Sequence, residues 1–78
     1  MLISLNSRVY RALIDELIRM RHAAGLTQRD FAKKVKRSPG WVSKLETYDK
    51  YIDIFELAPI VRALGGDPAK VYETFCVG

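Results

Sequence analysis

Basic side chains are concentrated between residues 26 and 44, where six Lys and Arg residues accompany a single acid, Asp30. Residues 45–78, by contrast, carry three basic and six acidic side chains. Clustered cationic groups bind phosphates and are the electrostatic footprint of nucleic-acid binding. Lys36, Arg37 and Lys44 are the better candidates for such contacts, whereas Lys33 and Lys34 are equally well explained as a solvated face. Arg29 lies between these two cases.

The end of the same segment carries residues suited to reading base edges. Pro39 and Gly40 are too small to block a DNA groove, and Ser43 and Lys44 can donate hydrogen bonds to bases or phosphates. Trp41 has two interpretations. It is either partly buried against the neighbouring loop, or it stacks on sugar and phosphate and donates its indole N–H to DNA.

Local signals predict that these residues lie on two short helices joined by a tight turn. Thr27 is a good N-cap for a helix starting near Gln28, and Asp30 can complete a capping box. Ser38 can cap the next helix, with Pro39 at its first position, where the missing N–H costs nothing. The apolar residues of each helix share one face, namely Phe31, Ala32 and Val35 in the first and Val42 and Leu45 in the second. Two such helices are how a small protein presents one helix to the major groove.

These residues resemble the Cro/C1-type (XRE-like) helix-turn-helix family of bacterial and phage regulators. The residues that match its pattern are Leu26, Thr27, Gln28, Ala32, Val35, Ser38, Val42, Ser43 and Glu46. The resemblance extends over about residues 13–64 and implies an all-α, compact five-helix bundle of the lambda-repressor-like DNA-binding type. It also implies that Gln28 binds a phosphate, and that Arg21 pairs with Glu46 as a packing device. The candidate DNA-binding residues are therefore Gln28, Arg29, Lys36, Arg37, Ser38, Pro39, Gly40, Trp41, Ser43, Lys44 and Tyr48.

Two residues depart from the family pattern, since Lys36 and Tyr48 stand where relatives usually have Gly. A left-handed backbone costs a non-glycine residue about 1 kcal/mol. Either the turn geometry differs here, or the two side chains gain a compensating contact, for example to a phosphate.

Three further helices are predicted outside the helix-turn-helix at about residues 27–47. The first covers about residues 8–24, with Asn6 or Ser7 as cap. The second follows Asp53 as cap and should kink or restart at Pro59. Its apolar residues, Phe55 among them, are dense enough that it is expected to be buried almost all round. The third starts at Asp67-Pro68. Residues 53–76 are expected to supply core and dimerisation surface, and the candidate dimer contacts are Leu2, Ile3, Val71, Tyr72 and Phe75.

Composition excludes several classes of protein. The chain has 78 residues, 49% of them hydrophobic, and a net charge of +4, which predicts one folded domain over residues 1–78 with a small core. One cysteine, Cys76, and one histidine, His22, give no disulfide or zinc site, and no cofactor is expected. Neither a membrane span nor a catalytic set is recognisable, so a non-enzymatic cytoplasmic, nucleoid-associated protein is expected.

Together these features lead to one main hypothesis and one alternative. The main hypothesis is a sequence-specific regulator of transcription, acting as a repressor, that binds double-stranded DNA as a homodimer on a palindromic operator. The alternative is an antitoxin-like module that captures a protein partner and binds DNA only secondarily. Pro39 and Gly40 keep this alternative open because relatives often carry Gln, Ser or Thr there. Chromosomal and prophage origins are both compatible with the sequence.

Overall fold

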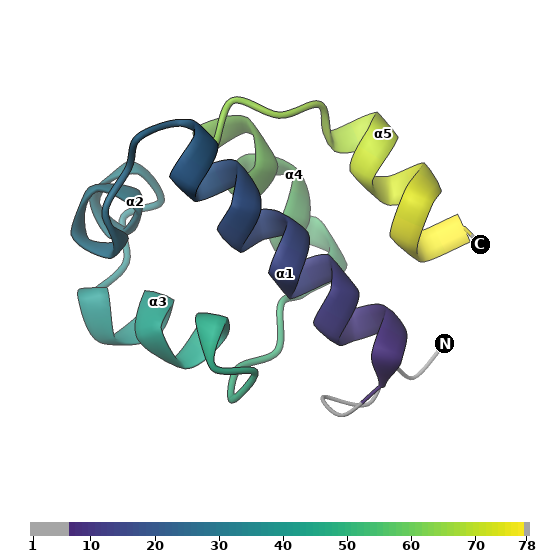
Figure 1. Ribbon diagram of the computed structural model, residues 1–78, viewed down its shortest axis with the longest axis horizontal. Coiled ribbons are helices and arrows are strands. Elements are labelled where there is room, and N and C mark those ends of the chain that lie inside the picture. Colours follow the sequence, from purple (N-terminus) through teal and green to yellow (C-terminus); the bar gives the residue numbers. More distant parts are fainter. Residues whose placement is uncertain (1–6, 78) are drawn as a thin grey trace.

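The computed structural model describes residues 7–77 of the chain, and within them all regular structure is helical. Five α-helices follow one another, which confirms the predicted all-α fold. They are α1 (Arg8–Ala23), α2 (Gln28–Lys34), α3 (Pro39–Glu46), α4 (Ile54–Ala63) and α5 (Pro68–Tyr72), and a π-helical turn, η1 (Glu73–Val77), continues α5. In Figure 1, α1 runs diagonally across the molecule, with α2 and α3 on one side of it and α5 on the other. The start of α1 and helix α5 lie on the side away from α2 and α3.

The helices begin where their caps were predicted. Ser7 caps α1, because its hydroxyl accepts a hydrogen bond from the backbone N–H of Tyr10 at 3.0 Å. Thr27 and Asp30 form the full capping box of α2, and the N–H of Thr27 holds the pKa of the Asp30 carboxyl below its ordinary value. Ser38, Asp53 and Asp67 cap the remaining three helices. Each of these capping bonds joins residues two or three positions apart, which is why sequence reveals caps.

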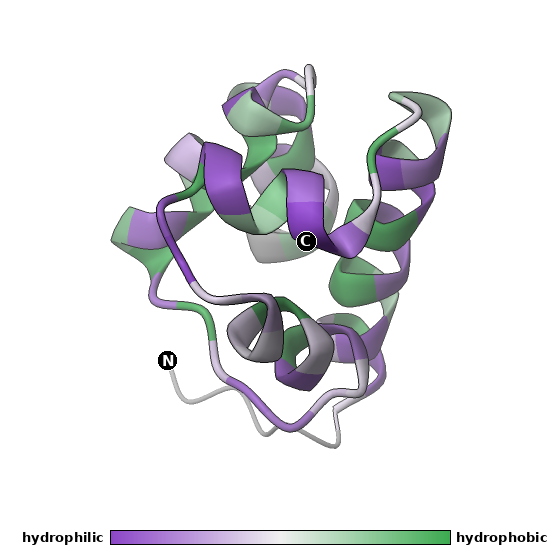
Figure 2. Cartoon of the chain, turned by 90° about the vertical axis from the view of Figure 1, so that its left-hand side faces the viewer, coloured by the Kyte–Doolittle hydropathy of each residue, from purple (hydrophilic) through white to green (hydrophobic). Residues whose placement is uncertain are grey.

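One apolar core receives side chains from all five helices. Its members are Tyr10, Leu13, Ile14, Leu17, Met20, Phe31, Ala32, Trp41, Val42, Leu45, Leu57, Ile60, Val61, Leu64 and Val71. Figure 2 shows hydrophobic and hydrophilic residues alternating along the helices, as amphipathic helices require. None of the described helices is long and apolar enough to cross a membrane.

Two predictions about α4 need correction. Of the kink or restart predicted at Pro59, the restart is wrong, because the helix continues from Ile54 to Ala63. Pro59 lies on the exposed face, where water can replace the hydrogen bond that its ring removes. The helix is also not buried all round, because Ile54 is 51% and Phe55 is 86% exposed. Both residues belong to the first turn of α4, which projects beyond the core.

The predicted dimer contacts at the C-terminal end also need correction. Val71 is only 7% exposed and belongs to the core, and Phe75 is partly buried against that core. Tyr72 remains exposed at 44%, because neighbouring residues on a helix face different directions. Leu2 and Ile3 lie outside the described residues. Of the described candidates, Tyr72 is thus exposed and Phe75 partly so.

Candidate nucleic-acid interface

Helix α3 presents to solvent a face made of three small residues and one lysine. Pro39, Gly40, Ser43 and Lys44 are all exposed, while Val42 and Leu45 on the opposite face are buried. The hydroxyl of Ser38 accepts the backbone N–H of Trp41 at 3.1 Å, which leaves its own hydrogen free to be donated. A major groove admits a helix with such a face, since small side chains allow close approach and donors can meet base edges.

Exposed cations surround this face. Arg29, Lys33, Lys34, Lys36, Arg37 and Lys44 are all exposed. Arg37 differs from the others, because its Nη2 lies 2.6 Å from Oε2 of Glu56 and its guanidinium lies 5.2 Å from the centre of the Trp41 ring. The charge of Arg37 is therefore partly neutralised by Glu56 of α4. Arg29, Lys36 and Lys44, by contrast, form no ion pair within residues 7–77.

Beneath this surface, a buried ion pair fixes α3 on the other two helices. Arg21 donates from Nε to Oε2 of Glu46 at 2.7 Å and from Nη2 to Oε1 at 3.0 Å. Both side chains are less than a tenth exposed. Arg21 also donates to the carbonyl of Leu26 at 2.8 Å, and Gln28 donates from Nε2 to Oε1 of Glu46 at 2.8 Å. Glu46 thus holds α1, α2 and α3 together.

Gln28 contacts Glu46 and still has donors to spare. One of the two N–H groups of its side-chain amide is donated to Glu46, which leaves the other available. The backbone N–H of Gln28 belongs to the first helical residue and has no intrahelical partner. The phosphate contact of Gln28 therefore stays a prediction, with the second amide N–H and the backbone N–H as its donors.

Lys36 and Tyr48 both adopt left-handed backbone, with φ of 58° and 65°. The turn geometry is therefore unchanged despite the missing glycines. Tyr48 gains contacts within the protein, since its hydroxyl donates to Oδ1 of Asp15 and the Arg11 guanidinium lies 4.6 Å from its ring centre. The hydrogen bond to Asp15 raises the pKa of Tyr48 above its ordinary value. Tyr48 thus anchors the end of α3 to α1, and its contact with DNA stays a prediction.

Trp41 is part of the core and not of the exposed face. It is 9% exposed, and its Nε1 is buried and has no hydrogen-bond partner within the described residues. The ring follows the buried face of α3 because residue 41 precedes Val42 and Leu45 by one and four positions. The structure therefore favours the burial interpretation over stacking on DNA.

Replacing Trp41 with Phe tests this assignment. The change removes a buried, unpartnered N–H, a gain that offsets the small cavity left by the smaller ring, so we expect the free energy of unfolding to stay within about 1 kcal/mol of wild type. DNA affinity should stay within about twofold, because a buried indole N–H would not reach a phosphate. Chemical denaturation followed by circular dichroism and fluorescence anisotropy with labelled duplex measure the two quantities. A tenfold loss of affinity at unchanged stability would restore Trp41 to the interface.

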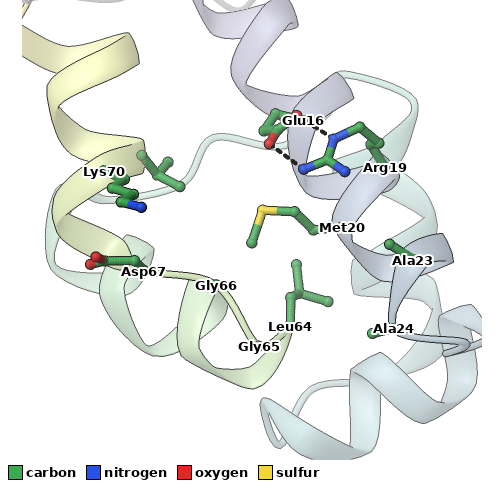
Figure 3. Close-up of a pocket in the computed structure, with 11 residues that line it drawn as sticks. Glu16, Arg19, Met20, Ala23, Ala24, Leu64, Gly65, Gly66, Asp67 and Lys70 are labelled. Atoms are coloured by element: carbon green, nitrogen blue, oxygen red, sulfur yellow. Dashed lines mark hydrogen bonds and ion pairs between the residues drawn. The ribbon is translucent and has the colours of Figure 1, made fainter.

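A pocket lies on the side of α1 opposite to α3. It is bounded by the C-terminal half of α1 and by the α4–α5 connection. It has a volume of 490 Å³, and its apolar lining includes Met20, Leu64 and Val71 (Figure 3). Two of its charged residues, Glu16 and Arg19, already pair at 2.7 Å, and the bond from Arg19 lowers the pKa of Glu16. Within the described part of the chain, no three His, Cys, Asp or Glu residues cluster to hold a metal ion.

Known proteins resemble this chain both in sequence and in the arrangement of the helices. Residues 12–73 match a family described as "Helix-turn-helix domain". An XRE-family like protein from Pseudomonas syringae pv. tomato str. DC3000 has a TM-score of 0.80 and 34% identity, covering 86% of this chain and 82% of that one. Two structures of the clp gene regulator ClgR from Corynebacterium glutamicum have TM-scores of 0.74 and 0.75, with 34% and 33% identity. These cover 83% and 86% of this chain, and 83% and 71% of the other. No curated protein matches the sequence significantly.

Proposed function

Since the chain belongs to the XRE-like helix-turn-helix family, we propose that it is a sequence-specific, non-enzymatic regulator of transcription that inserts α3 into the DNA major groove. The family resemblance over about residues 13–64 is confirmed by the family match of residues 12–73. The observation that carries the proposal is the exposed face of α3, where Gly40, Ser43 and Lys44 stand clear of the core amid exposed cations. The ClgR structures support the same class, because they are described as a gene regulator.

The proposed contacts divide into two kinds. Arg29, Lys36 and Lys44 neutralise phosphates and set the position of the protein on the duplex. Ser43, together with the backbone around Gly40, lies nearest to the base edges and supplies sequence preference. Few long side chains are available for base contacts, so much of the selectivity should come from DNA shape.

Binding as a homodimer to a palindromic operator completes the proposal. Each subunit would place one α3 in successive major grooves about 34 Å apart, and occupancy of a promoter would repress transcription. Such a protein acts in the cytoplasm, at the nucleoid.

A salt titration with Lys44→Ala tests the phosphate contacts. We expect wild type to bind duplex DNA with an affinity that falls linearly in log-log form as salt rises, and the variant to bind more weakly with a slope lower by about one. Lys70→Ala is the matched control, because it removes the same charge from α5, on the other side of α1 from α3 (Figure 1). An unchanged slope for Lys44→Ala would remove Lys44 from the interface.

The alternative function, capture of a different protein, is favoured by one observation. Phe55 and Ile54 expose apolar side chains on α4 that a free monomer would not need. An antitoxin-like module would use them to hold its partner. Co-purification of a second protein that is lost on replacing Phe55 would support this alternative.

A further inference from the structure

Arg37 stands at the edge of the proposed DNA-binding face. It directly precedes Ser38, the N-cap of α3, and its backbone N–H donates to the carbonyl of Ala32 at 2.9 Å, which fixes where its side chain begins. Guanidinium groups bind phosphate oxygens well, and consecutive Cα atoms lie only about 3.8 Å apart, so Arg37 begins beside the groove that α3 is proposed to enter. The position of its guanidinium therefore decides whether Arg37 adds to DNA binding.

The guanidinium of Arg37 is held toward α4. Its Nη2 donates to Oε2 of Glu56 at 2.6 Å, and the charged group lies 5.2 Å from the centre of the Trp41 ring. Trp41 and the exposed Ser43 are two positions apart on α3 and so lie on opposite sides of the helix. The ion pair and the ring therefore keep the positive charge on the flank of α3 and away from its exposed face.

The carboxylate of Glu56 is itself fixed in position. Its Oε1 accepts the backbone N–H of Asp53 at 3.1 Å, as one half of the capping box of α4, which leaves Oε2 for Arg37. The side chains of the pair are partly exposed, Arg37 at 46% and Glu56 at 32%. Exposed ion pairs are weak, so a phosphate can displace the carboxylate from Arg37 at a small cost.

The charge of Glu56 weakens DNA binding whether the pair is closed or open. A closed pair carries no net charge, so it neutralises no phosphate and releases no counterion. An open pair frees Arg37 but leaves an unpaired carboxylate beside it, which repels phosphates. In both states the protein binds DNA less tightly than it would with a neutral residue at position 56.

We propose that Glu56 is a positioning residue that restrains Arg37 and so limits the sequence-independent affinity of the protein for DNA. The inference rests on the proposed function and deepens it, because it separates Arg37 from Arg29, Lys36 and Lys44, which form no ion pair within the described part of the chain. Phosphate contacts supply essentially all non-specific binding. A restrained cation therefore favours release from the many sites where the exposed face of α3 finds no matching bases.

Salt titrations of Glu56→Gln with a labelled random-sequence duplex, followed by anisotropy, test this restraint. Gln keeps the side-chain oxygen that caps α4 and removes the charge, so circular dichroism should show an unchanged fold. We expect the affinity to rise about fivefold and the log-log salt slope to steepen by about one, because Arg37 gains a phosphate. Glu73→Gln is the matched control, since it removes an exposed acid from η1, and both quantities should stay as in wild type.

Arg37→Ala completes a double-mutant cycle. It should leave the slope of wild type almost unchanged, and it should return the slope of Glu56→Gln to the wild-type value. An unchanged slope and affinity for Glu56→Gln would overturn the restraint. A loss of affinity would overturn it too, because Glu56 would then present Arg37 to DNA, and so would a gain that persists with Arg37→Ala. A wild type that binds no duplex even at low salt would instead reject the proposed function, and the restraint with it.

Discussion

Replacing Gly40 with Glu is expected to stabilise the protein and to remove most of its affinity for DNA. Gly40 is the second residue of α3, and a Cβ there would meet only Oγ of Ser38, at 3.9 Å. Relief of glycine's entropy cost and the attraction of a first-turn acid to the helix dipole should add about 1 kcal/mol to the free energy of unfolding. The first turn of α3 contains no acid in the native protein.

The same carboxylate would enter the major groove among phosphates and acceptor-rich base edges. Like-charge repulsion of this kind costs several kcal/mol, so specific affinity should fall by at least about 100-fold. Gly40→Ala is the matched control, and it should gain similar stability without losing much affinity. Thermal unfolding and anisotropy titration give the two numbers for each variant. If Gly40→Glu binds DNA as wild type does, α3 does not enter a groove by its N-terminal face.

Replacing Glu46 with Ala is expected to destabilise the whole fold. The change leaves the Arg21 guanidinium buried without its carboxylate, and removal of one partner from a buried ion pair costs about 3–5 kcal/mol. Gln28 would lose its acceptor as well. Small proteins are stable by about 5–15 kcal/mol, so the variant should unfold at a much lower urea concentration, and its melting temperature should fall by more than about 10 °C.

A double variant separates the charge from the packing in this prediction. Arg21→Met combined with Glu46→Leu removes both charges while filling similar space, and it should be close to wild type in stability. Urea unfolding followed by circular dichroism, fitted for all four members of the cycle, measures the coupling. A loss below about 1 kcal/mol for Glu46→Ala would mean that the pair does not hold the three helices together.

Sequence was a good guide wherever structure depends on near neighbours. Thr27, Ser38, Asp53 and Asp67 cap their helices because a cap needs only the next three residues. The pairing of Arg21 with Glu46 spans 25 positions, and it was anticipated only through the family resemblance. Local rules carry no information about contacts between distant segments.

Several site residues take part in such distant contacts. Tyr48 reaches Asp15 on α1, 33 positions away, and Gln28 reaches Glu46, so the Tyr48 hydroxyl and one of the two Gln28 amide N–H groups are donated within the protein. Arg37 was identified as a cation, but its partner Glu56 comes from α4. Phe55 was counted as core because its neighbours are apolar, and only the packing of α4 shows that its first turn projects into solvent.

Selection of binding sites from random duplex DNA tests the central claim most directly. The purified protein, at moderate salt, should enrich an inverted repeat with half-sites about one helical turn apart, and Gly40→Glu selected in parallel should enrich nothing. That pair of results would establish sequence-specific recognition through α3 and would supply the operator. A folded wild-type protein that enriches no sequence would contradict the account and would favour a protein partner as its target.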